Sequence, residues 1–203
     1  MEKMFLDYIQ GVIAEPIGSI FVFLGMGAII ASYLLKGKSM KVILILAFLS
    51  NAFVAIGYLL QGQGINGAAS CLTGAVFSII NFLFDSKNKP VPRPMVVFYG
   101  LAFVGINIAV NFKNMVIFEG GFKLIPVQIV LCALAILGCL AFVMCIGQKN
   151  GAKYRFWNIM NMLMWCTYDI VSMNYVVLIT HLIQMGFAVV GMIIHDRKKK
   201  EEN

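Results

Sequence analysis

The stretch MVVFYGLAFVGINIAVNF, residues 95–112, decides how many times this chain can cross a membrane. It is the shortest of seven apolar runs in the sequence. The hydrocarbon core of a bilayer is about 30 Å thick, so a spanning helix needs about 20 mostly apolar residues. If residues 95–112 form such a helix the chain has seven spans, and if they do not it has six.

The composition indicates an integral membrane protein. Of the 203 residues, 61% are hydrophobic and 12% are charged, and the mean hydropathy is +0.88. Water-soluble domains are about 45–50% apolar and about 25% charged. The formal charge of +7 would suggest nucleic acid in a water-soluble chain, but here it lies between apolar runs, so we expect no nucleic-acid partner. The opening residues MEKMFLDYIQGVIAEP lack the pattern of a signal peptide, so we expect the first apolar segment to be retained.

Lysine and arginine placement distinguishes six spans from seven, because cytoplasmic loops collect positive charge. The seven predicted spans are 17–35, 42–60, 65–84, 95–112, 124–146, 154–172 and 176–194. With seven spans, thirteen of the sixteen Lys and Arg residues lie on one side, opposite Lys3, Lys113 and Lys123. Without the span at 95–112 they divide eight and eight. The asymmetry favours seven spans, with the N-terminus outside and the C-terminus in the cytoplasm.

The chain also aligns with itself, without gaps, at a shift of 110 residues. The matched positions include uncommon residue types: Pro16 with Pro126, Gly37 with Gly147, Asn51 with Asn161, and Tyr58 with Tyr168. The predicted helix boundaries match as well. The first three and last three spans are therefore interpreted as repeats, with the span at 95–112 connecting them.

One connecting helix gives the two repeats the same orientation in the membrane. We therefore predict an all-α integral membrane protein of seven transmembrane helices with a 3+1+3 plan. Its parts are a first three-helix repeat at 1–86, a linker with the fourth helix at 87–122, a second three-helix repeat at 123–195, and a basic cytoplasmic tail at 196–203. Parallel repeats of this kind occur in transporters, where the solute site lies near mid-membrane at the repeat interface.

Four short motifs resemble those of a known family. GVIA (11–14), GYLLQGQGINGA (57–68), LIP (124–126) and WCTYD (165–169) are similar to segments of the bacterial inner-membrane YgjV family. That family is similar in plan to the SWEET sugar carriers and the PnuC vitamin transporters of the MtN3-like superfamily. The resemblance covers residues 11–195 and implies a carrier in the bacterial inner (plasma) membrane.

One departure from the family pattern bears on the solute. Relatives often carry an Asn followed by an Arg in the third helix, where this chain has CLTGAVFS (71–78) with no cation. If that Arg binds an anion in relatives, the solute here is uncharged or cationic.

Two equivalent stripes of polar and aromatic residues are candidate binding residues. Asn161, Trp165 and Tyr168 follow helical spacing and share one face, and the repeat gives the second span the stripe Asn51, Ala55 and Tyr58. Amides and aromatic rings on facing helices suit a small polar organic molecule. Alternatively, the amides hold helices together and the tyrosines belong to an interfacial aromatic belt.

The last two spans carry the candidate gating or proton-coupling residues, Asp169 and His181. Imidazole changes charge near physiological pH, so His181 could bind solute or carry protons, or it could be a packing residue. Gln184, one turn further along, is a further candidate for binding. Asp169 is either at the external mouth, near the end of its helix, or a cavity or coupling group.

No pattern for catalysis or for a cofactor appears. The cysteines all fall in apolar runs without C-x-x-C spacing, and the two histidines have no partner at a metal-ligand spacing. We therefore expect a protein that is not an enzyme and has no cofactor or metal.

The sequence thus favours a carrier for a small polar solute, such as a vitamin, nucleoside or sugar, with alternating access between two three-helix bundles. The alternative is a non-transporting membrane receptor or partner-binding protein whose polar residues are structural. The expected partners are the solute and the lipid bilayer, and a homo-oligomer is possible.

Overall fold

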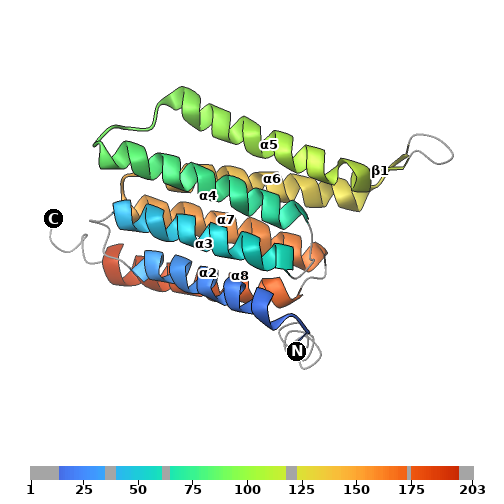
Figure 1. The fold of residues 1–203 in the computed structure, drawn as a ribbon, viewed down its shortest axis with the longest axis horizontal. Helices are drawn as coiled ribbons and strands as arrows, with labels where there is room; N and C mark the ends of the chain where they lie inside the picture. Colours follow the sequence, from blue (N-terminus) through green and yellow to red (C-terminus); the bar gives the residue numbers. More distant parts are fainter. Residues whose placement is uncertain (1–13, 35–39, 61–64, 118–122, 173–174, 197–203) are drawn as a thin grey trace.

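The computed structural model describes residues 14–34, 40–60, 65–117, 123–172 and 175–196. They form seven long α-helices and a short antiparallel β-ribbon (Figure 1). The helices are α2 (Pro16–Leu34), α3 (Met40–Leu60), α4 (Ile65–Ser86), α5 (Arg93–Met115), α6 (Pro126–Ile146), α7 (Gly151–Val171) and α8 (Tyr175–Asp196). The ribbon pairs β1 (Val116–Ile117) with β2 (Lys123–Leu124).

Each described helix coincides with one predicted span. The matched prolines Pro16 and Pro126 are the first residues of α2 and α6. Proline is tolerated in the first turn because its missing N–H would have no partner there. The apolar runs therefore predicted the helices and most of their ends.

The prediction for the fourth helix was wrong in its length. We expected the shortest span, but α5 has 23 residues and is the longest of the described helices. It begins at Arg93, with a proline in its first turn, and continues through Lys113 and Asn114 to Met115. The apolar pattern ends before the helical backbone does, because polar residues at a membrane surface can continue a helix.

Six of the described helices are long and apolar enough to cross a membrane, so the chain is a multi-pass membrane protein. The exception is α7, which has 21 residues but a more polar composition. Four of its polar side chains lie against other helices: Arg155, Asn158, Asn161 and Asp169 are all buried, whereas Lys153 and Thr167 are exposed. Most of the polar face of α7 is thus turned toward protein, while large apolar side chains cover much of the outer surface of the helices.

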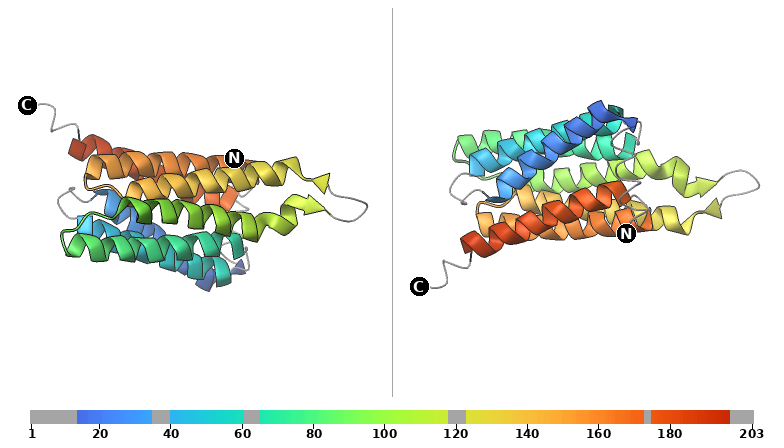
Figure 2. Two further views of the ribbon diagram at one scale, coloured as in Figure 1. Left: turned by 90° about the horizontal axis from the view of Figure 1, so that it is seen from above. Right: turned by 90° about the horizontal axis from the view of Figure 1, so that it is seen from below.

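The described helices form a closed ring. Each helix packs against the next along the chain, and α2 packs against α8 to close the ring (Figures 1 and 2). Consecutive helices run in opposite directions, so Leu34, Met40, Ser86, Arg93, Ile146 and Gly151 lie at one end of the ring (Figure 1). We call it the basic end, because it carries Lys41, Lys87, Lys89, Arg93, Lys149 and Lys153.

Two glycines let α2 and α3 approach closely. A Cβ atom at Gly25 would lie 2.8 Å from the backbone oxygen of Ser50, and one at Gly57 would lie 2.9 Å from the backbone oxygen of Gly18. Neither oxygen can move without shifting a helix. The separation of α2 and α3 therefore depends on these two glycines.

We expect Gly25→Ala to destabilise the protein and Gly27→Ala to leave it unchanged or slightly more stable. Overpacking costs about 1–3 kcal/mol, whereas nothing lies within 4 Å of a Cβ at Gly27 and alanine favours the helix. The melting temperatures of the two variants in detergent test this. Equal values would contradict the close contact at Gly25.

Candidate functional site

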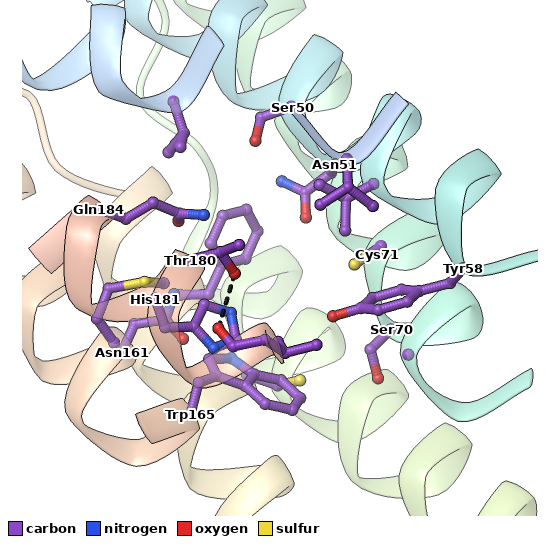
Figure 3. A pocket seen from close by; sticks show the side chains of 18 of the residues that line it. Ser50, Asn51, Tyr58, Ser70, Cys71, Asn161, Trp165, Thr180, His181 and Gln184 are labelled. Atoms are coloured by element: carbon purple, nitrogen blue, oxygen red, sulfur yellow. Dashed lines mark hydrogen bonds between the residues drawn. The ribbon is translucent and has the colours of Figure 1, made fainter. Parts of the chain in front are cut away.

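A cavity of about 140 Å³ lies inside the ring and receives residues from all seven described helices. Figure 3 shows its polar side chains on two facing sides. Ser50, Asn51, Tyr58 and Ser70 come from α3 and α4, and Asn161, Trp165, Thr180, His181 and Gln184 come from α7 and α8. The described lining contains no Lys, Arg, Asp or Glu side chain. The polar part of the lining therefore consists of neutral amides and hydroxyls and the imidazole of His181.

The structure brings most of the predicted binding residues together. Asn51, Tyr58, Asn161, Trp165, His181 and Gln184 all line the cavity. Tyr168 does not: it is partly exposed, and its ring lies 5.5 Å from the ring of Trp165, centroid to centroid. The two matched asparagines thus share one cavity, but the two matched tyrosines do not.

Asn161 presents an unsatisfied hydrogen-bond acceptor. Its side chain is 5% exposed, and its Oδ1 atom has no hydrogen-bond partner among the described residues. A buried polar atom left in this state costs about 1–3 kcal/mol. By contrast, the Oδ1 of Asn158, one turn away, accepts a hydrogen bond from the hydroxyl of Tyr33 at 3.1 Å. Asn158 is engaged by the protein, whereas Asn161 is free to accept a hydrogen bond from a solute.

Three glycines make room for three of the site residues. A Cβ atom at Gly74 would lie 2.9 Å from Oδ1 of Asn51, and one at Gly138 would lie 3.0 Å from Nε1 of Trp165. A Cβ atom at Gly67 would lie 2.9 Å from the ring of Tyr58. These glycines of α4 and α6 set how far each side chain stands from the neighbouring helix. They were not recognised as functional from the sequence, because glycine is frequent in membrane helices.

Asp169 and His181 form a direct pair between α7 and α8. The Nδ1 atom of His181 lies 2.7 Å from Oδ2 of Asp169. Asp169 is 2% exposed, and it does not line the cavity itself, whereas His181 does. The sequence left Asp169 at the external mouth or in the cavity; the structure places it behind His181. When the carboxylate is ionised, Nδ1 carries the proton, which leaves Nε2 for a solute.

A buried network closes the cavity toward the basic end. Tyr33 of α2 donates to Asn158 of α7, and Nη1 of Arg155 donates to the backbone oxygen of Tyr33 at 3.4 Å. The hydroxyls of Ser32 and Tyr154 lie 3.2 Å apart. The cavity extends away from the basic end, because its lining includes Ser19, Tyr58, Gly67 and Val177, which lie near the opposite ends of their helices. We call the network of Ser32, Tyr33, Tyr154, Arg155 and Asn158 the basic-end seal.

The seal contains residues that the sequence reasoning missed. Arg155 is one of the thirteen charges that the sequence assigns to the cytoplasmic side; it lies within the predicted span, in α7, and is 1% exposed. Asn158 precedes Asn161 by three residues, so it lies on the same face of α7 as Asn161 and Trp165. This spacing could have identified Asn158 as a candidate site residue from the sequence. Ser50 and Ser70 carried no such signal, since serine is common in membrane helices.

Changing Gly138 should move Trp165 toward the cavity. In a Trp157→Phe background Trp165 is the only tryptophan. We expect Gly138→Ala to shift its emission to longer wavelength, because the added methyl group displaces the indole toward water. Gly105→Ala is the control, since nothing lies within 4 Å of a Cβ there. Identical spectra for the two variants would show that Gly138 does not position Trp165.

Comparisons with protein-family models, curated proteins and solved structures found no match to this chain. The site is therefore interpreted from its own residues: a cavity inside the ring of helices with two matched amides, aromatic rings and a carboxylate–imidazole pair at its edge.

Proposed function

We propose that this chain is a membrane carrier for a small, uncharged polar solute. The observation that supports this best is the unsatisfied Oδ1 atom of Asn161, buried in a cavity inside the ring of helices. In hydrocarbon-embedded proteins, buried polar atoms without partners are costly and commonly mark pathways for solutes. A solute that donates a hydrogen bond to this oxygen would remove that cost.

The size of the cavity limits the size of the solute that it can hold. A cavity of about 150 Å³ in a protein core can hold benzene, and this one is of about 140 Å³. The cavity therefore suits one six-membered ring better than the two rings of a nucleoside. Among the expected classes, a single-ring vitamin or a monosaccharide fits best. Trp165 and Tyr58 would pack on the ring, and Asn51 and Asn161 would bind its polar substituents.

In this proposal the helices form two parallel three-helix bundles with α5 as the linker, and α7 also crosses the membrane. Support comes from the packing of α3 on α2 and α4, and of α7 on α6 and α8. The two matched asparagines also lie in one cavity. The basic end would face the cytoplasm, placing the N-terminus outside in a bacterial inner membrane. The likeness to the YgjV, SWEET and PnuC proteins remains part of the proposal.

Alternating access then requires the basic-end seal to open. Tyr33 and Ser32 belong to α2 in the first bundle, and Tyr154, Arg155 and Asn158 belong to α7 in the second. The seal therefore joins the two bundles. Rocking of one bundle against the other would separate these residues and expose the cavity to the basic side.

Binding is tested by the melting temperature of the purified protein with D-glucose, nicotinamide or uracil. We expect at least one to raise the melting temperature, and Asn161→Leu to abolish that rise. Because Asn161→Leu removes an unsatisfied atom, the ligand-free variant should melt at the same or a higher temperature. Thr167→Ala is the control, since Thr167 is exposed and donates to Leu163 of its own helix. If none of the three solutes raises the melting temperature, and Asn161→Leu melts at a lower temperature than the wild type, Asn161 has a structural role. That result would favour the non-transporting alternative.

Two native cysteines test the direction in which the cavity opens. Cys71 lines the cavity, whereas Cys145 is fully buried and donates to the backbone of Tyr154 in the seal. The test uses two variants in which Cys71 or Cys145 is the single remaining cysteine and the other four are replaced. A charged, membrane-impermeant methanethiosulfonate should modify Cys71 from the side opposite the basic end and leave Cys145 unmodified. Modification of Cys145 at the rate of Cys71 would contradict the seal.

A further inference from the structure

We propose that the Asp169–His181 pair is a proton-binding site and that solute binding in the cavity is coupled to the uptake of one proton there. This inference rests on the proposed carrier function and specifies its coupling ion. The structural basis is an asymmetric position: the carboxylate lies behind the imidazole, and only the imidazole reaches the cavity. His181 thus connects a buried charge to the space that the solute would occupy.

The buried carboxylate depends on His181 for positive charge. Isolated buried carboxylates are costly, so they are paired or take up a proton. The other titratable side chains that interact electrostatically with Asp169 or with its neighbouring tyrosines are thiols and phenols, which carry no positive charge in either form. They are Tyr58 of α3, Cys71 of α4, Cys132 of α6, and Cys166 and Tyr168 of α7. Within the described chain, His181 is the group that pairs with Asp169.

The pair has two states that differ by one proton. Without the extra proton, Asp169 is a carboxylate, His181 is neutral with its proton on Nδ1, and the pair carries one negative charge. With it, His181 is an imidazolium and the pair has no net charge. The proton comes from water in the cavity, binds to Nε2, and returns to water from the same atom. Nε2 therefore changes from a hydrogen-bond acceptor to a donor.

A solute favours the protonated state for two reasons. First, a solute in the cavity displaces the water that hydrates the pair. The negatively charged pair loses more hydration free energy by this than the neutral, protonated pair does. Second, the Nε2–H group can donate to a carbonyl or hydroxyl oxygen of the solute. Linkage is reciprocal, so a solute that promotes proton uptake binds more tightly at lower pH. In the pH range where the solute-free pair is unprotonated and the solute-bound pair is protonated, the dissociation constant of the solute should fall about tenfold for each unit by which the pH is lowered.

The first test needs no solute. The rings of Trp165 and His181 lie 6.1 Å apart, centroid to centroid. An imidazolium quenches an excited indole more strongly than a neutral imidazole does, so Trp165 can report the charge of His181. In the Trp157→Phe background, emission should therefore be weaker when the pair holds its extra proton, and should fall as the pH is lowered. This fall should vanish in His181→Gln and persist in His195→Gln, which changes the only other histidine. Emission that does not change with pH would overturn the proton site.

The second test measures coupling. D-glucose, nicotinamide and uracil are each added to the weakly buffered protein with a pH indicator, and the same solutes are tested for a rise in melting temperature. We expect the solute that raises the melting temperature to remove close to one proton per protein from solution, with no uptake in His181→Gln. Binding without proton uptake would overturn the coupling and leave the carrier proposal intact. If none of the three solutes binds, the carrier proposal fails for these classes and the coupling fails with it.

Discussion

Hydrocarbon offers no hydrogen bonds, and this constraint governs where the polar side chains of this chain lie. A polar group in a membrane helix must find a partner within the protein or face a cavity. The helices meet this requirement by closing into a ring, with apolar side chains outward and amides, hydroxyls and the imidazole of His181 inward. Two regions of the inner surface differ in this respect: in the basic-end seal polar groups bind one another, whereas in the cavity Asn161 retains an unpaired acceptor among the described residues.

The helix α7 contributes to both regions. Its first turns supply Tyr154, Arg155 and Asn158 to the seal, its middle supplies Asn161 and Trp165 to the cavity, and its last turns hold Asp169 against His181. A helix so polar cannot be stable facing lipid on all sides, so its position depends on the helices around it. In the proposed mechanism α7 would therefore connect movement at the seal to the solute and to the proton site.

The sequence predicted the helices well because their cause is local: an apolar run of sufficient length forms a helix in a membrane. The internal match of the sequence suggested that Asn51 and Asn161 meet inside the protein, and both side chains line the cavity. The match is no guide to Tyr168, because Tyr58 lies beside Gly67 and lines the cavity, whereas Tyr168 packs on Trp165 outside it. The burial of Arg155 and the pairing of Asp169 with His181 depend on contacts between helices, which hydropathy does not encode.

If the cavity binds a solute in transit across the membrane, the purified protein should carry that solute into closed vesicles. The most direct measurement is uptake of radiolabelled D-glucose, nicotinamide and uracil into proteoliposomes, comparing the wild type with the Asn51→Ala/Asn161→Ala double variant. We expect saturable uptake of at least one solute by the wild type, and its loss in a double variant that still folds. Saturable uptake that the double substitution leaves unchanged would contradict solute binding by Asn51 and Asn161 in the cavity.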